Sequence, residues 1–97
     1  MAYRVYILSC ASNTAIYIGS TGNLLERMEQ HRSGKGSAHT AKYRIRKLVH
    51  LETYPTIQDA RKREQLVKRW PRPWKNELIA KDNPDWRDLI GDVILLG

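Results

Sequence analysis

From residue 3 to residue 19 the chain runs Tyr-Arg-Val-Tyr-Ile-Leu-Ser-Cys-Ala-Ser-Asn-Thr-Ala-Ile-Tyr-Ile-Gly. Its first part, Tyr3–Ser9, is rich in β-branched and aromatic residues, as β-strands are. After the polar residues 11–14, the segment Ala15–Gly19 has the same character. A gap this short favours an antiparallel hairpin, because a few residues suffice to reverse the chain. We therefore expect two paired strands over residues 3–19.

Two tyrosines occupy equivalent places in this hairpin. Side chains alternate between the two faces of a strand, so Tyr6 lies on the face opposite Val5 and Ile7. Tyr17 likewise lies opposite its two isoleucine neighbours. Each tyrosine is thus flanked by expected core residues. Taken alone, this spacing indicates packing in the core or at its rim.

Downstream of the hairpin, turn residues and apolar periodicity predict three helices and a third strand. The first helix starts at the N-cap Asn23, with Glu26 three residues later as in a capping box, and runs to about Arg32. The other elements are a strand at 47–54, a helix from Thr56 to about Trp70 and a shorter helix at 74–80. Residues 33–42 show no clear periodicity, and we expect a mobile basic loop there. The order β-β-α-β-α-α predicts an α+β fold with a small antiparallel sheet.

Residues 82–97 are too apolar for a disordered tail. They include Trp86, Leu89, Ile90, Val93, Ile94, Leu95 and Leu96. We expect this tail to pack on a domain of residues 1–81 or to join a partner chain as a homodimer. A chain of 97 residues has room for one core and no second one.

Positive charge is concentrated in two segments. The formal net charge is +7 and the pI is about 9.9. Residues 32–47 contain six Lys/Arg and no acid, and residues 61–75 contain seven Lys/Arg and one acid, Glu64. Clustered cations indicate a polyphosphate partner such as nucleic acid. On charge alone, two solvated surface faces explain the pattern equally well.

Cys10 is the only cysteine, which excludes an internal disulfide and a structural zinc site built on thiolates. A reducing cytoplasm is the simplest compartment. Neither a signal-peptide pattern nor an apolar run of about 20 residues is found, so we expect neither export nor membrane insertion.

The remaining chemical candidates are the two tyrosines, an Arg/His pair and a lone acid. Arg27 and His31 share one helix face with Leu24 and Met28, and Glu64 falls on the apolar stripe of its helix. Phosphodiester hydrolysis with one hard metal ion uses such groups: a carboxylate for Mg²⁺ or Mn²⁺, a guanidinium for developing charge and a base for water. Taken singly, the Arg/His pair fits an amphipathic face and the carboxylate fits an ion pair. We assign His39 and His50 to solvent or strand packing.

In their order and spacing, these residues resemble the GIY-YIG nuclease family. Val5-Tyr6-Ile7-Leu8 is similar to the GIY segment, with its tyrosine present and its glycine absent, and Tyr17-Ile18-Gly19 is the YIG sequence itself. The family's helix arginine falls on Arg27. His31 falls on the position one turn later, which is a tyrosine or histidine in relatives. The resemblance covers roughly residues 1–81.

Two further family positions lie in the second half of the chain. The metal-binding glutamate falls on Glu64, and a family asparagine falls on Asn76. The resemblance implies a three-stranded antiparallel sheet flanked by helices and a one-metal endonuclease that uses Mg²⁺ or Mn²⁺. It also implies a setting in DNA repair or recombination.

The resemblance also implies a role for each site residue. Tyr6 or Tyr17 takes or relays a proton from water, Arg27 contacts the scissile phosphate, and Asn76 orients a ligand or substrate. The chain departs from the family at Ser20, where many catalytic relatives carry a lysine near the tyrosines. An unperturbed phenol is a poor base at neutral pH, so His31 is the expected substitute.

We expect the two basic segments to hold the backbone of DNA, in preference to RNA. The contacts are expected from Arg32, Lys35, Lys42, Arg44, Arg46, Arg61, Lys68 and Arg72. Two other classes of protein remain open: a non-catalytic nucleic-acid-binding module of the same fold, which Ser20 would suit, and a homodimeric interaction protein built on the apolar tail.

Overall fold

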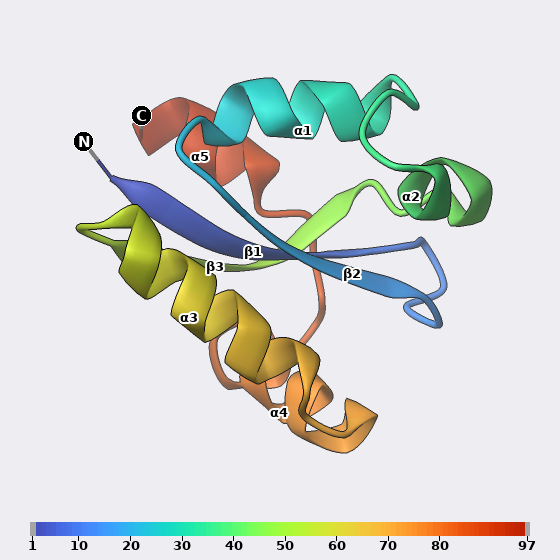
Figure 1. The fold of residues 1–97 in the computed structure, drawn as a ribbon. Helices are drawn as coiled ribbons and strands as arrows, with labels where there is room; N and C mark the ends of the chain where they lie inside the picture. The colour runs from blue at the N-terminus through green and yellow to red at the C-terminus, as the bar shows by residue number, and fades with distance from the viewer. Residues whose placement is uncertain (1, 97) are drawn as a thin grey trace.

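A computed structural model describes residues 2–96, and residues 94–96 by their backbone alone. The sequence forms three strands and five helices in this part of the chain (Figure 1). In chain order they are β1 (Tyr3–Ser9), β2 (Ile16–Thr21), α1 (Leu24–Arg32), α2 (Ala38–Tyr43), β3 (Lys47–Tyr54), α3 (Ile57–Lys68), α4 (Arg72–Asp82) and α5 (Ile90–Leu96). The predicted α+β class and the order β-β-α-β-α-α are confirmed, and α2 and α5 add to them.

The three strands form one antiparallel sheet in the order β2-β1-β3. Strand β1 is central, and Tyr6 pairs with Gly19 on one side and with Leu51 on the other. A register shift between Ile7 and Leu8 interrupts the pairing with β3. The predicted hairpin and the predicted third strand are therefore both present.

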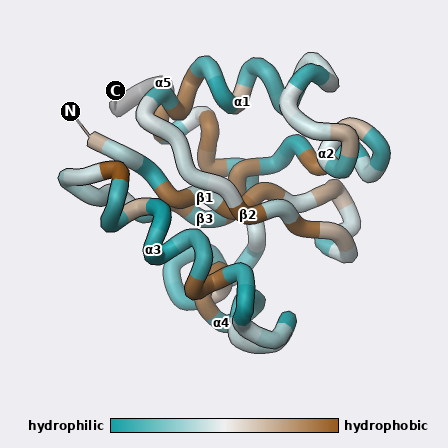
Figure 2. The backbone as a smooth tube through the Cα atoms, viewed as in Figure 1, coloured by the Kyte–Doolittle hydropathy of each residue, from teal (hydrophilic) through white to brown (hydrophobic). Residues whose placement is uncertain are grey.

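Helices cover both faces of the sheet. Figure 1 shows α1 and α5 on one face and α3 and α4 on the other. The cluster under α3 and α4 is built from Val5, Ile7, Ile18, Val49, Ala60, Val67 and Ile79. The cluster under α1 and α5 is built from Tyr6, Leu8, Cys10, Leu24, Met28, Ile45 and Leu48. Both faces of the sheet are thus lined with apolar side chains, and Figure 2 shows hydrophobic residues along the strands, with α1 and α3 mostly hydrophilic.

Helix α1 begins where the sequence predicts. The Asn23 side chain accepts a hydrogen bond from the Glu26 backbone N–H at 3.2 Å. The Glu26 carboxylate, however, accepts from the Asn23 side-chain amide, because the Asn23 backbone N–H is already bonded to Thr21. The expected bond from the Asn23 backbone N–H to the Glu26 side chain is therefore replaced by one from the Asn23 side-chain amide.

The expectation of an irregular loop at residues 33–42 is wrong for its second half, where α2 forms. Ser37 accepts from the backbone N–H of Thr40 at 3.1 Å, and Thr40 Oγ1 accepts from the backbone N–H of Ser37 at 3.3 Å. This reciprocal cap satisfies amides that a short helix would otherwise leave free. Arg44 ends α2 with a φ of 53°, and Ile45 after it is fully buried. The caps and the buried Ile45 stabilise this helix. Because its stability does not come from an apolar face, apolar periodicity does not predict it.

The chain after α4 lies against the exposed edge of β3. The side-chain amide of Asn83 donates to the carbonyl oxygen of Val49 at 3.0 Å, and the backbone N–H of Leu89 donates to that of Leu48 at 2.8 Å. Asp88 in turn accepts from the backbone N–H of Leu48. These bonds occupy backbone groups that an edge strand leaves open.

The tail also packs on the core, since Leu89, Ile90 and Val93 contact the cluster under α1 and α5. The side chains of Ile94, Leu95 and Leu96 lie outside the described part of the structure, as does Gly97. A contact of the tail with a partner chain, and the division of the chain at residue 81, stay predictions.

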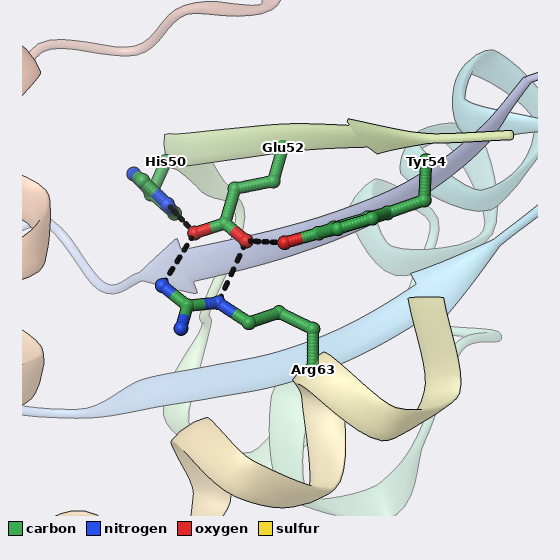
Figure 3. Close-up of polar contacts among 4 residues, drawn as sticks. All are labelled: His50, Glu52, Tyr54 and Arg63. Atoms are coloured by element: carbon green, nitrogen blue, oxygen red, sulfur yellow. Dashed lines mark hydrogen bonds and ion pairs between the residues drawn. The ribbon is translucent and has the colours of Figure 1, made fainter. Parts of the chain in front are cut away.

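A polar network fastens β3 to α3 (Figure 3). The Glu52 carboxylate accepts from His50 at 2.7 Å, from Tyr54 at 2.7 Å and from Nε and Nη2 of Arg63 at 2.9 and 3.2 Å. Burial alone would raise the pKa of Glu52, but the hydrogen bonds from His50, Arg63 and Tyr54 lower it to about 2. The network holds an edge strand to the helix that covers it.

Candidate active site

Tyr6 and His31 meet in the cluster under α1. The Tyr6 hydroxyl lies 3.1 Å from Nε2 of His31, and each residue is 1% exposed. The Tyr6 ring crosses the backbone of Gly19, where an added Cβ would overlap the phenol. The glycine of the Tyr-Ile-Gly sequence is therefore required by the close approach of this ring.

The other ring nitrogen of His31 contacts Thr40 at the start of α2. Nδ1 lies 3.1 Å from Thr40 Oγ1, and the Thr40 hydroxyl donates to the Ser37 carbonyl oxygen at 3.1 Å. A hydroxyl has one proton to give, so we infer that Nδ1 carries the proton between it and Oγ1. Nε2 is then the acceptor for the Tyr6 hydroxyl.

Tyr17 completes an aromatic group around His31. Its ring centroid lies 5.2 Å from that of His31 and 6.3 Å from that of Tyr6. Tyr17 is half-buried, so its ring joins the buried pair to the surface. The two tyrosines, which the sequence pattern alone assigns to packing, thus share one face and one histidine.

Arg27, one turn before His31 on α1, gives this group a positive charge. Burial raises the pKa of Tyr6, as does the Tyr17 phenol, and the Arg27 guanidinium acts in the opposite direction. Burial, then Arg27, lowers the pKa of His31. At neutral pH the site therefore holds a neutral imidazole and an un-ionised phenol. Arg27 also lines a cavity of about 200 Å³ together with Ser20 and Arg61.

Glu64, on α3, contacts Ser20 near the end of β2, beside the cavity that Arg27 lines. Its Oε1 accepts a hydrogen bond from the Ser20 hydroxyl, and its Oε2 accepts from Lys68 Nζ at 2.6 Å. The Glu64 charge acts on the Tyr6 phenol and raises its pKa. Ser20 therefore positions the carboxylate of Glu64.

The donor set at Glu64 fits a hard divalent ion. The described residues contain no group of three or more His, Cys, Asp or Glu side chains that could hold a metal, so protein side chains alone would not complete the shell of an ion at Glu64. Mg²⁺ commonly binds through one or two carboxylates, with water and substrate phosphates completing its shell. The Glu64 side chain is 14% exposed. Its partner Lys68 is an exposed ammonium, which a cation can displace.

Asn76 lies in a different set of contacts. Its side-chain oxygen accepts from Nε of Arg72 at 2.8 Å, and the same guanidinium donates to the carbonyl oxygens of Asn13 and Thr14. These bonds tie α4 to the turn of the β1–β2 hairpin. Within residues 2–93, no hydrogen bond connects Asn76 to the tyrosines, to His31 or to Glu64.

The expected nucleic-acid contacts fall into distinct groups. Arg61 lines the cavity at Arg27, Lys68 pairs with Glu64, and Arg72 is engaged with the hairpin turn. A second hollow, of about 530 Å³, is lined by Arg32, Arg44, Arg46 and Lys47 together with Asp88, which pairs with Arg32. Lys35 and Lys42 are exposed around α2. Apart from Arg72 on α4, these cations thus form two groups, one on and around α1 and α2 and the other on α3.

Comparison with known proteins identifies the fold family. A profile described as the GIY-YIG catalytic domain matches residues 2–77. The chain belongs to the GIY-YIG family. It is therefore a member of a nuclease family, whose members bind nucleic acid and generally use divalent metal ions. The described residues form no helix with the length and apolar character needed to cross a membrane.

The similar GIY-YIG proteins are small, like this chain. The UPF0213 protein of Syntrophus aciditrophicus is 43% identical over 84% of this chain and 92% of its own length. A UPF0213 protein of Natronomonas pharaonis is 36% identical over 82% and 93%. The solution NMR structure of the UPF0213 protein BH0048 from Bacillus halodurans is 30% identical, covers 91% of this chain and 93% of the other, and gives a TM-score of 0.58. The chain thus matches most of the length of each of these relatives.

Two features of the site lie outside the sequence prediction. Thr40 lies in the segment expected to be a loop, although the spacing of Ser37 and Thr40 is that of a capping box and indicates a helix start. The bond from Ser20 to Glu64 spans 44 residues of sequence, and no local pattern indicates it.

Proposed function

We propose that this protein is an endonuclease that hydrolyses a phosphodiester bond of DNA by a mechanism with one Mg²⁺ or Mn²⁺ ion. The observation that carries the proposal is the buried hydrogen bond between Tyr6 and His31, within electrostatic range of Arg27 and Glu64. A phenol, a neutral imidazole, a guanidinium and a carboxylate are the groups that this hydrolysis needs. We place its biological role in cytoplasmic DNA repair or recombination.

The proton leaves the attacking water through a relay. Because burial raises the pKa of Tyr6, the phenol does not act as a preformed phenolate. It accepts the proton of water at Oη while giving its own proton to Nε2 of His31, 3.1 Å away. In the resulting imidazolium, Nδ1 keeps its proton and its hydrogen bond to Thr40. Its positive charge is opposed by Arg27 and favoured by the negative charge of a bound phosphate.

Arg27 and Glu64 hold the other charges of the reaction. Arg27 faces the cavity at the end of β2, where its guanidinium would contact the scissile phosphate and stabilise the transition state. Glu64 would hold the metal ion after Lys68 moves away, and Ser20 keeps the carboxylate in position. The ion, when bound, supplies Lewis-acid stabilisation of the developing negative charge. Asn76 is proposed to orient the substrate near the hairpin turn.

The test is cleavage of a panel of duplex, nicked, branched and single-stranded DNA in Mg²⁺ or Mn²⁺, compared with EDTA. We expect metal-dependent cutting that falls at least about 100-fold in Glu64→Gln, while DNA binding measured in EDTA is retained. Glu77→Gln is the matched control, since Glu77 is an exposed acid on α4. Cleavage that persists unchanged in Glu64→Gln contradicts the proposal.

A second candidate function is a nucleic-acid-binding module without catalysis. It is favoured by one observation: both Glu64 oxygens already have protein partners, Ser20 and Lys68. The panel separates the two functions, because the module binds DNA in a salt-dependent way and cuts none of the substrates.

A further inference from the structure

The aromatic group of the candidate active site continues to the surface across α2. The Tyr17 ring centroid lies 6.4 Å from that of His39, which lies 5.0 Å from that of Tyr43. His39 is exposed, and Tyr43 is 48% exposed. Tyr17, His39 and Tyr43, called here the aromatic row, thus run from the buried Tyr6–His31 pair to solvent.

The short helix that carries the outer two rings is fixed from both ends. Its start is held by the reciprocal cap between Ser37 and Thr40 and by the contact of Thr40 with His31. After its end, Ile45 is fully buried, and its backbone N–H donates to the Thr40 carbonyl oxygen at 2.9 Å. The position of His39 and Tyr43 relative to Tyr17 is therefore set before any ligand binds, which lowers the entropic cost of binding.

Positive charge surrounds the row. Residues 32–47 contain six Lys/Arg and no acid, and Lys35, Lys42 and Arg44 are exposed around α2. Lys42 Nζ lies 5.3 Å from the Tyr43 ring centroid. This contact is held by an exposed and flexible side chain, so the ammonium can turn from the ring to a phosphate at small cost.

We propose that His39 and Tyr43 form a stacking site for an unpaired nucleobase of DNA, on the side of the candidate active site where the Tyr17 ring lies. The proposal rests on the proposed function and narrows its substrate to DNA with a single-stranded segment beside the cut. Exposed aromatic rings beside cations are how proteins hold single strands, because every base offers a face to stack. Bases inside a duplex are already stacked on their neighbours and would first have to be flipped out.

The experiment measures binding in EDTA, so it does not depend on cleavage. The probes are a single-stranded oligothymidylate carrying one 2-aminopurine, whose fluorescence falls on stacking, and a blunt hairpin duplex. We expect the single strand to bind at least about fivefold more tightly than the hairpin and its fluorescence to be quenched. Tyr43→Ala and His39→Ala should each weaken binding about five- to tenfold and reduce the quenching, whereas Tyr43→Phe should keep both.

Trp74→Ala is the matched control, because Trp74 is an aromatic residue of α4 that is 54% exposed and lies outside the aromatic row. It should bind and quench as the unaltered protein does. Equal affinity for hairpin and single strand, unchanged quenching in Tyr43→Ala, or an equal loss in Trp74→Ala overturns the proposal. If the binding results are as expected and no DNA is cut, the stacking site stands while the endonuclease proposal fails.

Discussion

The hydroxyl oxygen of Tyr6 lies 3.1 Å from Nε2 of His31, and this pair joins the central strand of the sheet to α1. Neither side chain has more than 1% of its surface exposed, so bulk water does not compete for the bond. Because burial keeps the phenol protonated and the imidazole neutral, the pair can pass a proton in one direction, from Tyr6 to His31.

Replacing Tyr6 with phenylalanine removes the relay and keeps the ring. We expect the cleavage rate to fall by about 100-fold or more. The free energy of unfolding should drop by about 1–3 kcal/mol, because Nε2 of His31 loses its donor. Tyr54→Phe is the control: it removes a hydroxyl from the Glu52 network and should leave cleavage unchanged. A normal rate in Tyr6→Phe would show that the relay is wrong.

We infer that the contact with Thr40 sets which nitrogen of His31 is protonated. In the unaltered protein, ¹⁵N chemical shifts of the ring should show a proton on Nδ1 and none on Nε2. Thr40→Val leaves Nδ1–H without an acceptor, so the population with the proton on Nε2 should increase. Thr40→Ser keeps a hydroxyl and should keep the original tautomer. A proton found on Nε2 of the unaltered protein would contradict the direction of transfer.

Lys68 competes with a metal ion for Glu64. Its ammonium lies 2.6 Å from Oε2, and such i,i+4 pairs contribute about 0.3–0.5 kcal/mol. Lys68→Met should therefore tighten Mn²⁺ binding about twofold, measured by water proton relaxation without DNA, and Glu64→Gln should abolish it. Lys62→Met removes an exposed charge of the same helix and should have no such effect. Weaker Mn²⁺ binding in Lys68→Met would count against this site.

Glu52 contributes stability through its ionised form. The pKa of its carboxyl is about 2 in the folded protein against 4.5 for a free side chain, which corresponds to about 3 kcal/mol. This stability is present above pH 4.5 and is lost as the pH falls towards 2. Urea unfolding of Glu52→Gln should thus show a free energy of unfolding about 3 kcal/mol lower than that of the unaltered protein at neutral pH. This difference should shrink as the pH falls from 4.5 towards 2. Glu77→Gln, at an exposed position, should change little at any pH.

The tail covers the edge of β3. A chain ending at residue 81 loses the bonds to Leu48 and Val49 and the packing of Leu89, Ile90 and Val93. We expect it to unfold at a lower urea concentration and to self-associate, because open strand edges pair with other chains. Light scattering after size-exclusion chromatography checks this. If the full-length protein is a dimer and the truncated chain is a monomer, the tail instead forms the interface of a homodimer.

Much of the fold follows from local patterns. Strands β1 and β3 match their predicted ranges because alternation and β-branched composition act within a few residues, and α1 starts at Asn23 because its cap is a local bond. The short helix α2 lies outside the predicted elements, because its caps and the buried Ile45 after it stabilise it without any apolar periodicity. In the site, the residues matching the family motif could be named from the sequence, but their partners could not.

The strands, the longer helices and the face on which each tyrosine lies can be inferred from the amino-acid order, because these features depend on neighbours a few residues apart. Three contacts arise only when the chain packs: Tyr6 with His31, Ser20 with Glu64, and Asn83 with the edge of β3, which span 25, 44 and 34 residues. Periodicity fixes the face of an element and leaves open which side chain of another element lies opposite it. That choice is made when helices pack on the sheet, where each buried polar group needs a partner.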